Sequence, residues 1–177
     1  IVLGQTVDFV GSQAGITLTD NSTGVLVEYG DDDFIMLNGV DLGPNGQVDG
    51  SSSDDNMSLG FTDGQGEAVT NGDDIIFGFA GNDDISGGKG DDQIFGGDGD
   101  DVINGNKHNN MLYGDAGDDD ISSGQHASEL FGGTGDDHLT GVMAKGGGHE
   151  FTGGSGADVF EFVYASSNKV DDAVITD

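Results

Sequence analysis

The sequence contains no cysteine, no tryptophan, a single proline, and only four lysines and arginines among its 177 residues. The absence of cysteine excludes disulfide bonds and thiolate metal sites. No run of 18 apolar residues occurs, so we expect no segment that inserts into a membrane as a spanning helix. The chain starts at Ile1 without Met and ends at Asp177, and we expect it to be a piece of a larger protein.

The shortage of positive charge is the strongest signal in the composition. The chain has 34 Asp and Glu residues against 4 Lys and Arg, which gives a formal net charge of −30. A compact domain with this charge repels itself unless cations neutralise part of it. Nucleic acid and anionic membrane surfaces would add charge of the same sign, so neither is an expected partner. Inorganic cations are the expected partners.

The order of the residues changes the interpretation of the composition. With 35 glycines and only 33% hydrophobic residues, the composition by itself favours a disordered chain. From residue 71, however, eight consecutive nonapeptides share one register: NGDDIIFGF, AGNDDISGG, KGDDQIFGG, DGDDVINGN, KHNNMLYGD, AGDDDISSG, QHASELFGG and TGDDHLTGV. A block of three extra residues falls between Leu139 and Phe151, after which GGSGADVFE resumes the pattern. Such a period indicates a repeat architecture.

Two positions of the repeat, one apolar and one acidic, carry the structural information. One is apolar throughout: Ile76, Ile85, Ile94, Ile103, Leu112, Ile121, Leu130, Leu139, Phe151 and Phe160. Its neighbours are mostly polar, which predicts a short strand with one inward side chain. Such a strand cannot bury itself, so the repeats must stack and share a core. Two nonapeptides then form one coil of 18 residues, with two parallel sheets and a row of Gly-rich turns along each rim.

The motif in these turns resembles that of the repeats-in-toxin (RTX, hemolysin-type) family, GGxGxDxUx, where U is a large apolar residue. Residues 87–94 (GGKGDDQI) and 153–160 (GGSGADVF) match it position by position. The resemblance covers about residues 69–162. It implies an all-β fold, a right-handed parallel β-roll, extracellular calcium binding, and export through a type I secretion channel.

Calcium also fits the chemistry of these turns. It takes six to eight oxygen ligands, from carboxylates and backbone carbonyls. A Gly-rich turn exposes carbonyls and its Asp adds a carboxylate, but one turn supplies too few oxygens, so two stacked turns must share an ion. On the resemblance, the predicted metal ligands are Asn71, Asp73, Asp74, Ala80, Asn82, Asp83, Lys89, Asp91, Asp92, Asp98, Asp100, Asp101, Asn110, Ala116, Asp118, Asp119, Thr134, Asp136, Asp137 and Asp158.

The register divides the acidic position between the two rims, because successive turns alternate. Rim 1 has an acid in every turn: Asp83, Asp101, Asp119, Asp137 and Asp158. Rim 2 loses it along the chain: Asp74, Asp92, Asn110, Ser128 and His149. We therefore expect about four to five calcium ions, mostly on rim 1. On rim 2, His108, His126 and His149 allow a second hypothesis, a zinc or nickel site, but we favour ordinary drift of turns that no longer bind calcium.

Outside the repeats the sequence predicts less. We assign residues 1–66 to a β capping region of short strands, in which residues 46–66 form a long loop, residues 67–164 to the roll, and residues 165–177 to a tail. No HExxH motif, GxSxG motif or cysteine nucleophile occurs, so we expect no enzymatic activity and no catalytic residues in this piece. The expected function is a secreted calcium-binding module that folds outside the cell. The alternative is an accessory module that binds a polysaccharide or a cell surface.

Overall fold

A computed structural model describes residues 17–20, 25–29, 33–34, 47–143, 148–164 and 173–176. Every regular element in these ranges is a β-strand, so the described part of the chain has no helix that could cross a membrane. The chain divides into two compact units, residues 1–43 and residues 44–177. In the first unit β2 (Val25–Tyr29) pairs antiparallel with both β1 (Thr17–Asp20) and β3 (Asp33–Phe34). The predicted capping role of this region stays a prediction.

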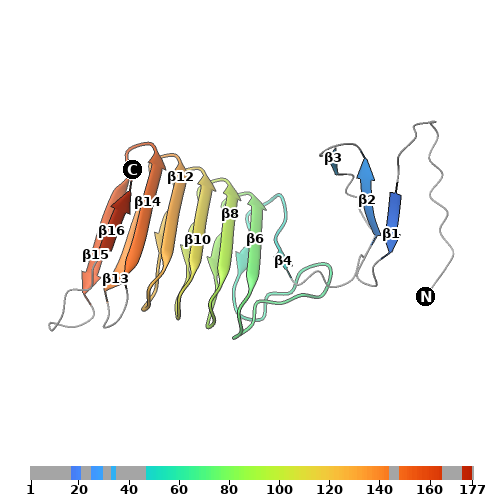
Figure 1. The fold of residues 1–177 in the computed structure, drawn as a ribbon, viewed down its shortest axis with the longest axis horizontal. Coiled ribbons are helices and arrows are strands. Elements are labelled where there is room, and N and C mark those ends of the chain that lie inside the picture. The colour runs from blue at the N-terminus through green and yellow to red at the C-terminus, as the bar shows by residue number, and fades with distance from the viewer. Residues whose placement is uncertain are drawn as a thin grey trace. The chain divides into compact units, whose positions relative to one another are not determined.

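The second unit is a stack of coils built from two parallel sheets (Figure 1). Strands alternate between the sheets along the chain. The seven-stranded sheet contains β4 (Val48–Asp49), β6 (Ile75–Ala80), β8 (Gln93–Asp98), β10 (Met111–Ala116), β12 (Glu129–Thr134), β14 (His149–Ser155) and β16 (Ala173–Thr176). The six-stranded sheet contains β5 (Asn56–Met57), β7 (Asp84–Ser86), β9 (Val102–Asn104), β11 (Asp120–Ser122), β13 (His138–Met143) and β15 (Val159–Tyr164).

The strand register follows the 18-residue coil predicted from the sequence. Leu112 lies opposite Ile94 on one side and Leu130 on the other, and Ile121 lies opposite Ile103 and Leu139. The predicted all-β parallel β-roll is therefore confirmed. Each strand contributes one inward side chain, because successive residues of a strand point to opposite faces.

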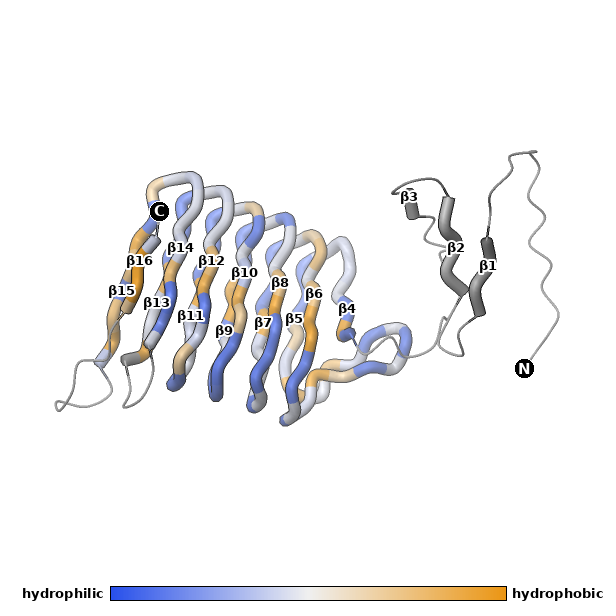
Figure 2. The backbone as a smooth tube through the Cα atoms, viewed as in Figure 1, coloured by the Kyte–Doolittle hydropathy of each residue, from blue (hydrophilic) through white to orange (hydrophobic). Residues whose placement is uncertain are grey.

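The core is a double column of these inward residues. Nine of the ten predicted apolar positions, from Ile76 to Phe151, are at most 1% exposed, and Val48, Met57 and Val69 extend the column toward the N-terminus. The tenth, Phe160, is partly buried and lies edge-on to Phe151 with ring centroids 6.1 Å apart. Figure 2 shows these apolar segments on the strands and the polar residues at the turns. The core is narrow, so it exists only while the coils stay stacked.

A ladder of aromatic rings covers part of the outer face of the seven-stranded sheet. Phe77, Phe95, Tyr113 and Phe131 occupy equivalent positions in successive coils, and their ring centroids lie 4.7, 4.8 and 4.7 Å apart. The rings are almost parallel, with interplanar angles of 4°, 7° and 6°. Their spacing equals the distance between neighbouring strands, so the ladder holds the coils in the same register as the core.

Parallel strands also occur on both sides of residues 67–164, the range predicted for the roll. The predicted loop over residues 46–66 is wrong in two places, because β4 and β5 pair in parallel with β6 and β7. These pairs join residues 28 apart (Val48 with Ile76), since residues 58–70 make an excursion closed by the bridge between Thr62 and Ala68. Within the predicted tail, β16 pairs in parallel with β14 and continues the seven-stranded sheet.

Replacing Ile103 by Ala tests the column as the source of stability. Ile103 is 1% exposed at the centre of β9, and truncation of a buried Ile costs about 2–5 kcal/mol of the free energy of unfolding. The matched control is Val102→Ala in the same strand, where the side chain is 50% exposed and the expected loss is below about 0.5 kcal/mol. Denaturant unfolding in calcium buffer measures both, and equal losses would contradict the assignment.

Candidate metal centre

The two rows of turns differ in position and in composition. The turns of rim 1 follow the long strands β6, β8, β10, β12 and β14, at the ends marked by the arrowheads in Figure 1. The turns of rim 2 precede the same strands. On rim 1 each turn runs from a glycine to an Asp five residues later, as in Gly96–Asp101 and Gly114–Asp119.

Glycine is required at two places in the rim 1 turns that begin at Gly96, Gly114 and Gly132. Gly99, Gly117 and Gly135 have φ values of 132°, 136° and 133°, which other residues rarely adopt. A Cβ on Gly117 would also collide with the carbonyl of Gly99 in the preceding coil. The first glycine of the turn has a different reason, because a Cβ on Gly114 would collide with Oδ2 of Asp119. The turn thus closes tightly around the carboxylate.

One oxygen of each rim 1 carboxylate ties neighbouring coils together. The backbone N–H of Asp83 donates to Oδ1 of Asp101 at 2.7 Å, and that of Asp101 donates to Oδ1 of Asp119 at 2.8 Å. The series continues from Asp119 to Asp137 and from Asp137 to Asp158, both at 3.0 Å. On rim 2 the N–H of Asp74 donates to Oδ1 of Asp92 at 3.0 Å. The structure therefore brings the predicted acidic pairs together, coil on coil.

The second oxygen of the same carboxylates is buried and lacks a hydrogen-bond partner within the described part of the chain. This holds for Oδ2 of Asp83, Asp92, Asp101, Asp119 and Asp137, and these residues are only 1–2% exposed. An ionised carboxylate buried without a partner is strongly destabilising. The arrangement therefore fits a bound cation, which would supply the missing charge at each of these oxygens.

Burial has the expected effect on the acidity of these groups. The pKa of Asp119 is raised from 3.8 to about 7, mainly by desolvation; the hydrogen bond from the Asp101 N–H lowers it, and the neighbouring carboxylates, first that of Asp101, add to the rise. Desolvation likewise raises the pKa of Asp92 and of Asp101 to about 6. It also raises the pKa of Asp83 and of Asp137. Without a cation, the carboxyls are thus stabilised in their neutral form.

The predicted ligands one residue earlier in the turn form an exposed ladder outside the buried one. Oδ1 of Asn82 accepts the N–H of Asp100 at 3.1 Å, and Oδ1 of Asp100 accepts that of Asp118 at 3.0 Å. Asp118 and Asp136 continue the ladder at 2.8 Å each. On rim 2, Asp73 and Asp91 do the same for the next coil, at 2.9 and 3.0 Å.

The predicted ligands three residues before the buried acid contribute backbone rather than side-chain oxygens. The carbonyls of Asp98, Ala116 and Thr134 each accept the N–H of a glycine in the preceding coil, at 2.9, 2.7 and 2.8 Å. Ala80, Asn71 and Lys89 occupy the equivalent position in their turns. Among the described residues no three His, Asp or Glu side chains converge in a metal-binding group. A cation on either rim would therefore need turn carbonyls besides the buried carboxylate.

Rim 2 changes character after Asp92. The amide nitrogen of Asn110 donates to the carbonyls of its own turn, so the predicted ligand Asn110 presents a donor there. Among the described residues, the histidines of the second hypothesis, His108, His126 and His149, form no group that could hold a metal ion. Nδ1 of His126 accepts the backbone N–H of His108 at 3.2 Å, with the two rings 5.7 Å apart and edge-to-face.

Rim 1 contains one more turn than the sequence pattern predicted. Asp55 stands in the same row as Asp83, because its N–H donates to Oδ1 of Asp83 at 2.8 Å. Asp54 extends the outer ladder by accepting the N–H of Asn82 at 2.9 Å. The signal was the spacing of Gly50 and Asp55, which equals that of Gly78 and Asp83. The ten additional residues between the two turns place Asp55 outside the nine-residue period.

The raised pKa values predict a pH dependence of known sign. In the folded chain the buried carboxyls bind protons up to about pH 6–7, whereas in the unfolded chain they lose them near the ordinary pKa of 3.8. Between these limits the folded state binds more protons, so the free energy of unfolding without calcium should fall as pH rises. Far-UV circular dichroism without calcium from about pH 4 to 7.5 measures this as a loss of β-signal with rising pH, and a gain of β-signal with rising pH would contradict it.

Comparison with known proteins agrees with the geometry. A family model described as the RTX calcium-binding nonapeptide repeat (4 copies) matches residues 69–94, 87–121 and 126–141. No curated protein and no solved structure matches the chain. The matched segments contain the turns with buried, unpartnered carboxylate oxygens at Asp83, Asp92, Asp101, Asp119 and Asp137. The chain therefore carries RTX calcium-binding nonapeptide repeats of the hemolysin type, stacked as a parallel β-roll.

Proposed function

We propose that this roll is an extracellular module whose folding is driven by calcium bound between neighbouring turns. The observation that carries the proposal is the row of buried carboxylate oxygens without a donor. A net charge of −30 opposes compaction, and divalent cations inside the turns neutralise charge where it is most concentrated. Because the two turns that share an ion come together only in the folded roll, binding energy becomes folding energy.

The same observation supports four ions on rim 1 and one on rim 2. The carboxylates of Asp83, Asp101, Asp119 and Asp137 would hold the first four, and that of Asp92 the fifth. Carbonyls of the Gly-rich turns would complete each shell, since calcium accepts neutral backbone oxygens in flexible geometry. When bound, the ion supplies positive charge and no chemistry of its own. The repeats are themselves non-catalytic.

The proposed place of action follows from the affinity expected of such sites. Extracellular calcium modules have dissociation constants of about 10⁻⁴–10⁻³ M, so the roll would stay unfolded at cytosolic calcium levels and order after export. This suits passage of an extended chain through a type I secretion channel, as the resemblance implies. Binding to a polysaccharide or a cell surface stays the alternative. The net charge of −30 requires calcium bridges if that partner is a polyanion.

Calcium titration tests the coupling between binding and folding. In excess chelator we expect the β-signal in far-UV circular dichroism to be largely lost. It should return cooperatively at about 0.1–1 mM calcium, and magnesium at the same concentration should not restore it, because its octahedral, water-rich coordination suits these turns poorly. A compact roll in chelator, shown by circular dichroism and light scattering, would refute the proposal.

Substitution of Asp119 by Asn tests the assignment of the buried acid. Asp119 is 2% exposed and lies between two acidic coils. The Asp119→Asn variant retains a side-chain oxygen but loses the charge, so we expect at least one fewer calcium ion by isothermal titration calorimetry and a lower Tm in calcium. The matched control is Asp120→Asn, which removes the same charge from a side chain that is 60% exposed. Equal effects of the two substitutions would show that net charge, rather than a site, controls binding.

A further inference from the structure

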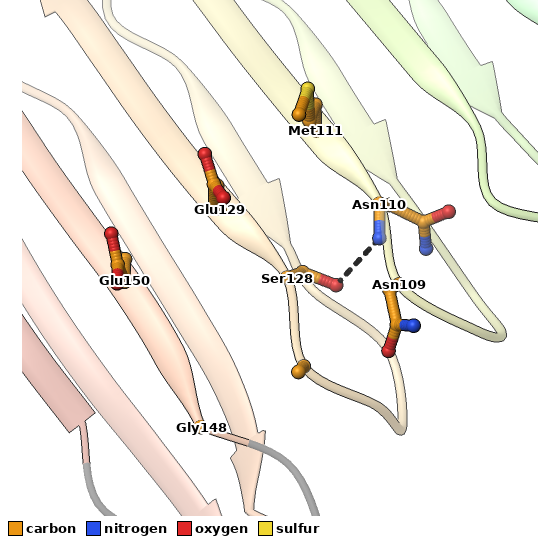
Figure 3. A pocket seen from close by; sticks show the side chains of 8 residues that line it. Asn109, Asn110, Met111, Ser128, Glu129, Gly148 and Glu150 are labelled. Carbon is orange, nitrogen blue, oxygen red and sulfur yellow. Dashed lines mark hydrogen bonds between the residues drawn. The ribbon is translucent and has the colours of Figure 1, made fainter.

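The turns of rim 2 after Asp92 place hydrogen-bond donors where rim 1 has bare carboxylate oxygens. Asn110, Ser128 and His149 stand in the row of Asp74 and Asp92 and are 2%, 3% and 0% exposed. Figure 3 shows Asn110 and Ser128 joined by the hydrogen bond from the Asn110 N–H to Ser128 Oγ, at 3.1 Å. This bond continues the coil-to-coil series that the Asp residues form on rim 1.

The two terminal atoms of the Asn110 side chain have different roles, one as an acceptor toward the neighbouring coil and one as a donor to its own turn. Its Oδ1 accepts the N–H of Asp92 at 2.9 Å, as an Asp Oδ1 would. Its Nδ2 donates to the carbonyl of Gly105 at 2.9 Å and to that of Lys107 at 3.3 Å. In the rim 1 turns of Asp83, Asp101, Asp119 and Asp137 the atom at this place is Oδ2, which has no partner among the described residues. The amide thus delivers N–H groups to carbonyls that elsewhere face a carboxylate.

Ser128 and His149 close their turns in the same way. Ser128 Oγ lies 3.3 Å from the carbonyls of Ser123 and of His126, toward which it donates. The Nδ1 atom of His149 accepts the N–H of Ser128 at 3.2 Å, which leaves Nε2 to donate to the Val142 carbonyl at 3.2 Å. Each residue keeps one bond to the neighbouring coil and supplies a donor to its own turn.

The N-terminal turns show a second form of the same arrangement. Oδ2 of Asp55 accepts the N–H of Ser51 at 2.7 Å and its Oγ at 2.8 Å. Asp74 accepts the N–H of Thr70 at 2.9 Å and its Oγ1 at 2.9 Å. Both carboxylates are thereby satisfied by their own turn, in contrast to Asp83 and Asp92 in the next coil of each rim.

We infer that Asn110, Ser128 and His149 are built-in substitutes for the cation, so that the rim 2 turns Gly105–Asn110 and Ser123–Ser128 close without metal. The inference rests on the proposed function of the five bare carboxylates. It assigns calcium selectivity within the roll to one atom per turn: a turn with Oδ2 facing its carbonyls takes an ion, and a turn with N–H or O–H there does not. Asn110 is then a residue that excludes calcium, although its side chain has the shape of a ligand.

The test is to convert Asn110 to Asp and count the ions. The introduced carboxylate would turn a second oxygen toward the carbonyls of Gly105 and Lys107, a repulsion that a cation relieves. We expect titration calorimetry to show about one more calcium ion than in the parent chain, and the calcium midpoint of folding to rise because the turn now needs metal. The matched control is Asn104→Asp, which adds the same charge at an exposed side chain of β9 outside the predicted ligand positions and should leave the ion count unchanged.

A second variant keeps the inference open to refutation if the Asn110→Asp substitution impairs folding. Asn110→Ala removes the donor without adding charge. We expect a lower Tm in saturating calcium with an unchanged number of bound ions. Loss of an ion in Asn110→Ala would show that Asn110 is itself a ligand. That result, or an unchanged ion count in a folded Asn110→Asp variant, would overturn the inference. If the parent chain binds no calcium at all, the proposed function fails instead.

Discussion

The structure depends on the interactions of one buried carboxyl group in each coil, that of the rim 1 Asp. A nonapeptide has a single large inward side chain, and beside it stands an acid that is nearly as deeply buried. One oxygen of this acid accepts an N–H from the neighbouring coil, which makes the acid part of the stacking. The other oxygen faces the interior of its own turn. The group cannot be removed without loosening the stack, and it cannot remain charged there without a positive partner.

The other features of the roll are arranged around this conflict. The first glycine of the turn leaves room for Oδ2, and the glycine three residues later allows the chain to pass close to the coil before it. The apolar column and the aromatic ladder keep the coils in one register, so that successive acids align. Local conformation, packing and charge therefore specify the same 18-residue coil, which is the consistency expected of a sequence that encodes one structure.

The nine-residue period and the residue types at its apolar and acidic positions were sufficient to predict the sheets, the core and the two rims. Strict recurrence at nine residues leaves few alternative folds. Two things lay outside that argument. Ten extra residues separate the turn at Asp55 from the next turn of rim 1. The turn therefore does not fit the nine-residue period, although its spacing from Gly50 is the usual one. The orientation of Asn110 was the second, because an amide offers oxygen or nitrogen and only its hydrogen bonds show which one faces the turn. The ion count, the metal ligands and the domain limits remain predictions.

Chain length varies along the roll on one side only. Every rim 1 turn, from Gly50–Asp55 to Gly153–Asp158, spans the same number of residues. The long excursion before β6 and the extra residues between β13 and β14 both fall in connections of rim 2. On the proposed function, a turn that shares an ion with both neighbours would tolerate no change in length, whereas a turn closed by its own donors would. Loop grafts or inserted peptides should therefore be accommodated in the turns of rim 2, whereas the length of the rim 1 turns has to stay constant.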